Sequence, residues 1–267
     1  MSARSSSLEC RSLGVGIGMG PRLAVVDKAL QAGRFTAILG PNGAGKSTLM
    51  SMLVGERMPQ SGDVWLDGQP LAAHDGQQLA RRRAFMAQDC SVAFDFTARE
   101  VVELGRYPHR QHPSPQEEVI APQAMALAGV AHLGGRSIRQ LSGGERARVH
   151  LARALAQVWE RPGDEDTCWL LLDEPTAALD LAHQHRCMGL LRQLAERQGL
   201  GVVAVIHDLN LALRYAHEVL LLGAQSLCGP VAQVLTPQAI ERVWGVTCTP
   251  VTAEDGVQQY LFANKNE

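Results

Sequence analysis

The chain has 267 residues, of which 46% are hydrophobic, 19% are charged and 4% are aromatic, and its formal net charge at pH 7 is −2. This length allows one large domain or a domain with a subdomain, and the hydrophobic fraction is enough to fill a core, which excludes a largely disordered chain. The near-neutral charge and the few aromatic residues argue against a nucleic-acid partner. The six cysteines are widely spaced, which favours reduced thiols over zinc or disulfide sites.

The sequence predicts neither a membrane span nor an export signal. The longest uncharged stretch, residues 219–240, is interrupted by Gly223, Gly229 and Pro230, whereas a membrane-crossing helix needs about 20 mostly apolar residues. The first ten residues lack the apolar region of a signal peptide. If the protein works at a membrane, we expect a partner to hold it there.

Four short apolar runs each end at a polar or glycine-rich element. The runs are Phe35–Leu39, Ala84–Ala87, Trp169–Leu172 and Val202–Ile206. Such runs are typical of strands buried on both faces of a parallel sheet, and ligands of these sheets bind beyond the carboxyl ends of the strands. We therefore predict an α/β fold with a mostly parallel sheet, and one shared site formed by the residues that follow the four runs.

The middle of the chain has the pattern of a helical insert. Thr97 and Glu100 have the spacing of a capping box, which predicts a helix start. Residues 107–116 contain three prolines and two histidines and indicate an irregular, exposed loop. From Ser142 a further helix is predicted, because apolar side chains recur with the helical period. These positions are Ala147, Leu151, Ala154, Leu155 and Val158.

Three parts of the chain can be predicted from these patterns. Near the C-terminus, Thr236 and Pro237 indicate the start of a helix that runs to Trp244. The predicted parts are an α/β core from residues 1–86 and 161–244, a helical subdomain from residues 87–160, and a small strand–turn–strand appendage from residues 245–267.

A glycine-rich loop with a phosphate-binding pattern follows the first run. Residues 40–47 match G-x-x-x-x-G-K-[ST] at every position. In this pattern Lys46 contacts the β- and γ-phosphates, the Ser47 hydroxyl contacts Mg²⁺, and Thr48 lies towards the α-phosphate. The alternative is a glycine turn that merely opens a helix. The candidate phosphate-binding residues are Gly40, Pro41, Asn42, Gly43, Ala44, Gly45, Lys46, Ser47 and Thr48.

Two acidic residues follow the third run. Asp173 closes a strand, as a magnesium ligand does, and Glu174 is placed to orient or deprotonate a water molecule. Without the glycine loop, the same residues would be an ordinary loop start. A GTPase is not favoured, because its Asn-Lys-x-Asp motif has only a near match at residues 264–267. An adenylate-type kinase would need an arginine-rich lid.

Residues 141–145, Leu-Ser-Gly-Gly-Glu, complete a set of motifs, and from about Leu8 to Trp244 the chain resembles ATP-binding cassette (ABC) ATPases, the motor subunits of transporters. The resemblance implies a P-loop NTPase core, similar to RecA, with ATP and Mg²⁺ as cofactors. It also implies that Ser142, Gly143 and Gly144 form the signature, which caps the γ-phosphate bound to a second copy of the chain. A serine hydroxyl and glycine amides at a helix N-terminus suit an anion. An ATP-sandwich homodimer is therefore expected.

By the same resemblance, Gln88 senses Mg²⁺ and water, His207 is the switch histidine near the γ-phosphate, and Asp180 contacts the partner across the dimer. The expected catalytic residues are Glu174, His207 and Gln88, and the expected magnesium ligands are Ser47, Gln88 and Asp173. Taken alone, a glutamine or histidine at a strand end is usually an ordinary polar residue with satisfied hydrogen bonds. Two features depart from the family: residues 14–20 contain no aromatic side chain to stack on adenine, and Glu145 stands where glutamine is commoner.

The helical subdomain is expected to face a membrane partner. Phe94, Phe96 and Tyr107, with Val92 and Val101, are predicted to line a groove for a permease helix, and the alternative is that they pack the subdomain's own core. The resemblance implies two transmembrane permease subunits. The protein would then lie peripherally on the cytoplasmic face of the bacterial inner membrane.

Among ABC proteins, the chain is most similar to importer subunits for metal chelates, above all haem importers. The residues that carry this likeness are 79–83, 93–97, 169–175 and 179–185. It implies haem uptake assisted by a periplasmic haem-binding protein. Ferric-siderophore or cobalamin import, and a soluble ABC ATPase in DNA repair or translation, remain alternatives. His109 and His112 are interpreted as exposed loop histidines rather than haem ligands.

Overall fold

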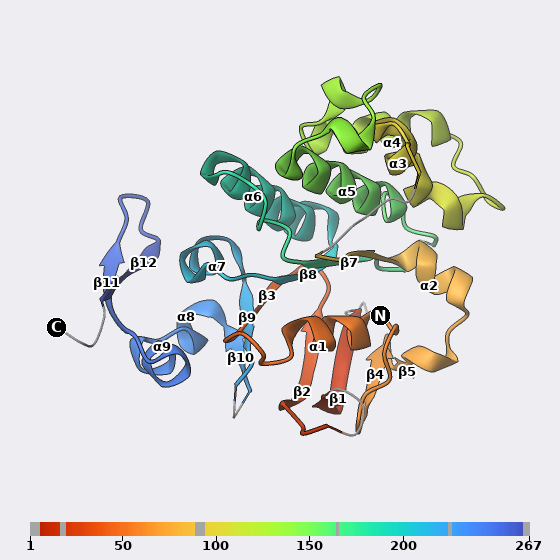
Figure 1. Ribbon diagram of the computed structural model, residues 1–267. Helices are drawn as coiled ribbons and strands as arrows, with labels where there is room; N and C mark the ends of the chain where they lie inside the picture. Colours follow the sequence, from red (N-terminus) through yellow and green to blue (C-terminus); the bar gives the residue numbers. More distant parts are fainter. Residues whose placement is uncertain (1–5, 17–19, 89–93, 164–165, 224–225, 264–267) are drawn as a thin grey trace.

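A central six-stranded sheet organises the computed structural model, which describes residues 6–16, 20–88, 94–163, 166–223 and 226–263 (Figure 1). The strand order is β10-β9-β3-β8-β7-β6, in which neighbours from β9 to β6 are parallel and the edge strand β10 is antiparallel to β9. The predicted α/β fold with a mostly parallel sheet is confirmed. The bounds are β3 Phe35–Leu39, β6 Arg83–Met86, β7 Trp169–Asp173, β8 Gly201–Val205, β9 Glu218–Leu221 and β10 Leu227–Pro230.

The sheet separates two hydrophobic cores. Every residue of β3, β7 and β8 is buried, which explains why these strands are continuous apolar runs. Successive side chains point to opposite faces. On β7, for example, Leu170 and Leu172 pack into one core and Leu171 into the other.

A four-stranded antiparallel sheet covers one face of the central sheet, with helix α1 (Lys46–Leu53) packed in the shared core. This sheet was not predicted from the sequence. Burial alternates along β2, where Ala24 and Val26 are buried while Val25 and Asp27 are exposed, but Val25 is apolar, so the sequence itself does not show the period of two. Its strands, in the order β2-β1-β4-β5, are β1 Ser7–Val15, β2 Ala24–Gln31, β4 Asp63–Leu66 and β5 Gln69–Pro70.

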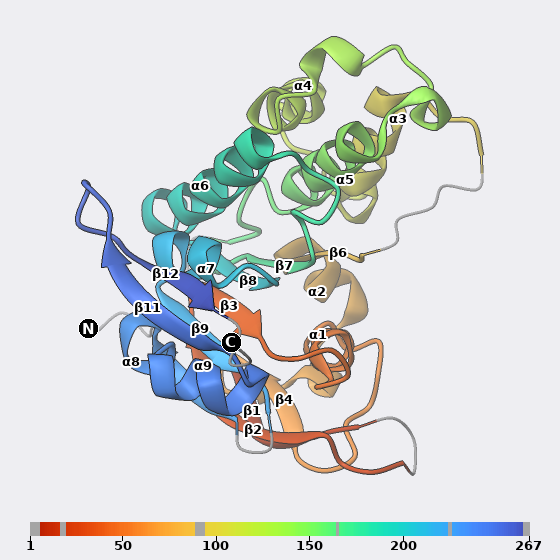
Figure 2. The ribbon, with the colours of Figure 1, turned by 60° about the vertical axis from the view of Figure 1, so that its left-hand side comes forward.

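Helices cover the opposite face, on the side away from α1 (Figures 1 and 2). Those that share a core with the sheet are α5 Gly143–Gln157, α6 Leu181–Gln198 and α7 Leu209–Tyr215. α3 (Ala98–Glu103) and α4 (Glu117–Leu127) pack on α5 and complete a helical group. The limits predicted for the helical subdomain, residues 87–160, stay a prediction. Within the described ranges, no helix has both the length and the apolar character needed to cross a bilayer.

Short elements complete the chain. They are η1 Leu71–Ala73, α2 Gly76–Arg82, η2 Leu104–His109, η3 Ala131–Leu133, η4 Ile138–Gln140, α8 Val231–Val234, α9 Pro237–Trp244, β11 Thr247–Thr252 and β12 Gln258–Ala263. The predicted helix from Pro237 to Trp244 is confirmed, with Thr236 as its N-cap. The predicted strand–turn–strand at the C-terminus corresponds to the antiparallel pair β11–β12.

One local prediction is confirmed, and another is confirmed in part. The Thr97–Glu100 capping box is present at the start of α3. Residues 110–116 are irregular and, apart from half-buried Ser114, exposed, so the predicted loop and the exposed His112 are confirmed there. Residues 107–109 belong to η2 instead, and His109, predicted to be exposed, is buried at 4% exposure. The ring of His109 has Nε2 2.8 Å from the carbonyl oxygen of Gln157. Burial lowers the pKa of His109, so this histidine is a neutral packing residue rather than an exposed one.

Candidate functional site

The glycine-rich loop joins the end of β3 to the start of α1. Gly40 and Gly45 have φ angles of 150° and 93°, a region that favours glycine. A Cβ atom on Gly40 would lie 2.6 Å from the carbonyl oxygen of Leu222, and one on Gly45 would lie 2.8 Å from Cγ1 of Val15. Only glycine fits at these two positions. Gly45 is also the N-cap of α1 and provides no side-chain cap, so the first-turn N–H groups are available to an anion.

Lys46 lies across this loop. Its Nζ atom donates hydrogen bonds to the carbonyl oxygens of Gly40, at 2.9 Å, and Pro41, at 3.1 Å. Burial lowers the pKa of Lys46, and the nearby charges of Glu174 and Asp173 act in the opposite direction. The ammonium group is therefore held at the loop by neutral acceptors, where a polyphosphate would provide stronger ones.

Asp173 ends β7 and is 5% exposed. In the described part of the chain, its Oδ1 atom is buried without a hydrogen-bond partner. Burial raises the pKa of Asp173, and a hydrogen bond with the Ser47 side chain opposes that effect. A buried carboxylate oxygen with no partner, next to a serine hydroxyl, fits a hard cation such as Mg²⁺.

Glu174 is the point where three strand ends meet. His207 follows β8, and its Nε2 atom lies 2.5 Å from Oε1 of Glu174. Gln88 follows β6, and its Nε2 atom donates to Oε2 of Glu174 over 3.1 Å. Since β6, β7 and β8 are adjacent parallel strands (Figure 2), their carboxyl ends bring these three side chains together, as the strand pattern predicted. Glu174 itself has a φ of 54°, which is uncommon for a residue other than glycine.

Ser142 begins α5 with a reciprocal pair of hydrogen bonds. Its Oγ atom accepts from the N–H of Glu145 at 3.3 Å, and its own N–H donates to Oε2 of Glu145 at 2.8 Å. This capping box was missed in the sequence, although the S-x-x-E spacing at 142–145 indicates it. It explains why glutamate is suitable at position 145: its carboxylate caps the helix, and the backbone N–H of Ser142 lowers the pKa of Glu145.

The Ser142–Gly144 segment lies on the surface beside the segment that leads to α6. Ser142 and Gly143 are exposed, and a Cβ atom on Gly144 would lie 2.9 Å from the carbonyl oxygen of Ala178. Asp180 caps α6 by accepting from the N–H of His183 at 2.8 Å, and its side chain is 68% exposed. The predicted site residues thus form two groups, one around Lys46 and Glu174 and one at the exposed start of α5 and α6.

Some residues bearing on the site fall outside the described part. They are residues 17–19 of the glycine-rich stretch, Val92 and residues 264–267. Among the residues that the structure describes, no three His, Cys, Asp or Glu side chains come together as metal ligands. Magnesium at nucleotide sites is usually held by one or two protein side chains and the phosphates, so Ser47 and Asp173 are a sufficient protein contribution.

Comparison with known proteins identifies the class. The family model described as ABC transporter matches residues 23–177, and the chain belongs to this family of ATP-binding, ATP-hydrolysing transporter subunits. A hemin import ATP-binding protein from Methylobacillus flagellatus is 41% identical over 262 residues, covering 97% of each chain. Its counterpart from Nocardia farcinica is 48% identical and covers 85% of this chain and 78% of the relative.

Solved structures have the same fold. A metal-chelate-type ABC transporter in an inward-facing conformation is 27% identical, with a TM-score of 0.79 and 98% of each chain covered. A dimeric bacterial ABC transporter cassette is 28% identical, with a TM-score of 0.71, and the match covers 85% of this chain and 98% of that one. The expectation of a P-loop NTPase core is confirmed.

Proposed function

We propose that this chain is the ATP-hydrolysing subunit of an ABC importer for haem. The observation that carries the catalytic part is the carboxylate of Glu174, held by His207 and Gln88 beside the Lys46 loop. The cargo is supported by the relatives named as hemin import ATP-binding proteins, whose similarity extends over most of the chain.

In this proposal the loop at Gly40–Thr48 binds the triphosphate of ATP. The uncapped first turn of α1 presents N–H groups to the phosphates, and Lys46 exchanges its two carbonyl acceptors for phosphate oxygens. Ser47, Asp173 and Gln88 would hold Mg²⁺, with the orphaned Oδ1 of Asp173 as the best-placed oxygen. When bound, Mg²⁺ neutralises charge on the phosphates that leave and transfer.

Glu174 acts on the attacking water. A carboxylate has about four acceptor sites, so the single contacts from His207 and Gln88 leave room for a water molecule on each oxygen. Glu174 then orients this water and accepts its proton, while His207 and Gln88 keep the carboxylate in place. Catalysis rests mainly on positioning and electrostatics, as expected for phosphoryl transfer.

A second copy of the chain would complete the site. Ser142, Gly143 and Asp180 are exposed, and their described contacts are to Glu145, Ala178 and His183 of their own surroundings. We therefore assign Ser142–Gly144 to the γ-phosphate bound by the partner and Asp180 to the dimer contact. ATP favours the closed homodimer because these contacts form only there.

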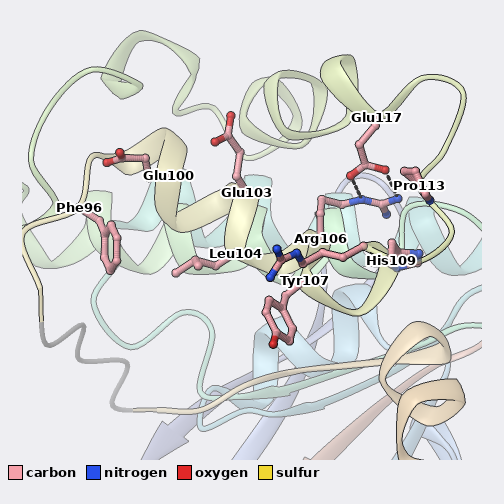
Figure 3. A pocket seen from close by; sticks show the side chains of 10 residues that line it. Phe96, Glu100, Glu103, Leu104, Arg106, Tyr107, His109, Pro113 and Glu117 are labelled. Carbon is pink, nitrogen blue, oxygen red and sulfur yellow. Dashed lines mark hydrogen bonds and ion pairs between the residues drawn. The ribbon is translucent and has the colours of Figure 1, made fainter.

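The permease contact is assigned to a groove of about 550 Å³ on the helical group. Figure 3 shows Phe96, Leu104 and Tyr107 along its lower side and Glu100 and Glu103 along its upper side. Tyr107 is 66% exposed, and Phe94, which contacts Phe96 edge to face, is 71% exposed. Val101 does not belong to this groove, because it is fully buried.

We propose that the groove on each copy of the chain binds an amphipathic helix from one of the two permease subunits. The protein would thereby be held on the cytoplasmic face of the bacterial inner membrane, with a periplasmic haem-binding protein on the other side. Tyr107→Ser is expected to reduce co-purification with the permease. The exposed Leu227→Ser, on β10, is the matched control, and equal co-purification of both variants would contradict the assigned surface.

The deciding experiment is ATPase stimulation in the assembled transporter. The subunit is purified with its permease and incorporated into lipid, and hydrolysis is measured with binding protein loaded with haem, cobalamin or ferric siderophore. Selective stimulation by the haem-loaded protein is expected. Selective stimulation by cobalamin or ferric siderophore would show that this chelate, and not haem, is the cargo. Failure to assemble with any permease would favour an ABC ATPase that does not act in transport.

A further inference from the structure

The side chain of Asn210 joins helix α7 to the C-terminal hairpin β11–β12. Its Nδ2 atom donates to the carbonyl oxygen of Tyr260 at 3.1 Å, and its Oδ1 atom accepts from the N–H of Tyr260 at 2.8 Å. One amide side chain therefore makes the same pair of bonds with β12 that a neighbouring strand would make. Figures 1 and 2 both place β12 next to α7.

The other polar groups of Asn210 are also used. Its backbone carbonyl oxygen accepts from Nε2 of Gln259 at 3.3 Å, and its backbone N–H donates to Oδ1 of Asp208 at 2.7 Å. At the far end of the helix, Arg214 forms an ion pair with Asp255 in the hairpin turn at 2.5 Å. The position of α7 is thus set by the hairpin at both ends of the helix.

The hairpin in turn is anchored to the core of the protein. Tyr260 is 3% exposed and belongs to the main hydrophobic cluster. Its hydroxyl donates to the carbonyl oxygen of Leu235 at 2.6 Å. Because this hydrogen bond is to a residue outside α7, the hairpin has an attachment of its own against which the helix can be positioned.

His207 lies three residues before Asn210. Its own segment is fixed on the other side by Ile206, which is buried and donates its N–H to the carbonyl oxygen of Ile38 at 3.1 Å. The side chain of His207 is 49% exposed, and its hydrogen bond is to the carboxylate of Glu174. With so little packing of its own, the imidazole depends on the backbone at either side for its position.

We propose that Asn210 is a positioning residue for His207, and that through it the C-terminal hairpin controls the rate of ATP hydrolysis. The inference rests on the proposed role of His207 and goes beyond it, because it gives the hairpin a part in hydrolysis. A displacement of the reacting geometry by about 1 Å can lower a rate by about a hundredfold, so a small shift of α7 is enough to affect turnover.

The test is a double-mutant cycle in ATP hydrolysis with the full chain. Asn210→Ala should lower kcat about tenfold with an unchanged KM for ATP, because the phosphate loop is untouched. In a His207→Ala background, Asn210→Ala should lower kcat by less than about twofold, because the side chain through which Asn210 acts is already absent. Leu261→Ser is the control: this residue is exposed on β12, next to Tyr260, and its replacement should leave kcat unchanged.

Several outcomes separate this inference from the proposed function. Equal losses in both backgrounds, or a change in KM alone, would overturn the positioning role of Asn210. Unchanged hydrolysis in His207→Ala alone would instead overturn the proposed role of His207. If Asn210→Ala does not fold, Asn210→Asp replaces it: this change keeps the acceptor for the N–H of Tyr260 and removes the donor. The same criterion of non-additivity applies.

Discussion

The Nε2 atom of His207 lies 2.5 Å from Oε1 of Glu174, although the two residues are 33 positions apart. Gln88, 86 positions from Glu174, binds the other oxygen of the same carboxylate. The carboxylate is thus fixed from two strand ends while both oxygens keep acceptor capacity. The orientation of this carboxylate is therefore set by side chains of the chain itself, and in the proposed mechanism ATP has to bring only the water and the phosphate to it.

Replacement of Glu174 by glutamine should separate binding from hydrolysis. The amide keeps the size of the side chain but cannot accept a proton, so we expect kcat to fall by about a hundredfold or more while ATP affinity is retained. Phosphate release and nucleotide titration measure the two quantities. Glu118→Gln, at an exposed position on α4, is the matched control. Near-normal turnover of Glu174→Gln would refute the role of Glu174 as a base.

Replacement of Lys46 by alanine should weaken triphosphate binding. The ammonium group now bonds to two carbonyl oxygens, and charge-assisted bonds to phosphate are worth about 1.5–3 kcal/mol each, so the Kd for ATP should rise by roughly ten- to a hundredfold. Titration with a fluorescent nucleotide measures the change, and Lys28→Ala on β2 controls for the loss of a charge. An unchanged Kd would overturn the phosphate assignment.

The meeting of the three strand ends around Glu174 could be predicted because the information is local. Each apolar run stops at a polar residue, and parallel strands place their carboxyl ends on one edge, so Gln88, Glu174 and His207 had to converge once the runs were neighbours. The antiparallel sheet could not be predicted in the same way. β1 pairs with β4 more than fifty residues away and is interrupted by an irregularity between Cys10 and Leu13, which hides its period.

The burial of His109 also lay outside what the sequence could indicate. Its surroundings depend on the carbonyl oxygen of Gln157, 48 positions away, and on the packing of η2 against α5. Prolines and histidines at 107–116 are compatible with either an exposed loop or a packed one. The Ser142–Glu145 capping box, by contrast, is a local pattern and was available.

An ion pair inside the helical group should make stability depend on pH. Arg106 is 6% exposed, and both of its donors to Glu117 are within 2.9 Å, which lowers the pKa of Glu117 below its usual 4.5. For an acid with a lowered pKa in the folded state, the stabilisation is complete above the unfolded value and is lost as the pH falls through the folded value. The contribution of Glu117 is therefore present at pH 7 and disappears below 4.5.

Glu117→Gln tests this pair. At pH 7 the free energy of unfolding should fall by about 2 kcal/mol, less than for a fully buried pair, because Glu160 remains 3.6 Å from Arg106. Below pH 4.5 the difference between variant and wild type should shrink. Denaturant unfolding at both pH values measures it, with Glu118→Gln as control. A difference that is independent of pH would contradict the prediction that the ionised Glu117 carboxylate stabilises the fold.

The composite site predicts that two inactive variants restore each other's activity. Lys46→Ala disables the phosphate loop, and Ser142→Asp disables the signature by bringing a negative charge to the γ-phosphate. Aspartate is chosen because it is a good N-cap, so α5 keeps its start. In a mixed dimer, the intact loop of one chain faces the intact signature of the other, so one of the two sites is complete.

Each variant alone should be nearly inactive, and an equal mixture should regain up to about one quarter of wild-type turnover, since half of the dimers are mixed and each has one complete site. Mixing after dissociation by dilution, followed by phosphate-release measurements, gives the comparison. Ser142→Asp alone should still bind ATP with an unchanged Kd, because Ser142 lies on the exposed surface, in a different group of residues from Lys46. A mixture no more active than the average of its components would mean that the signature serves its own chain, and the sandwich of two copies would have to be abandoned.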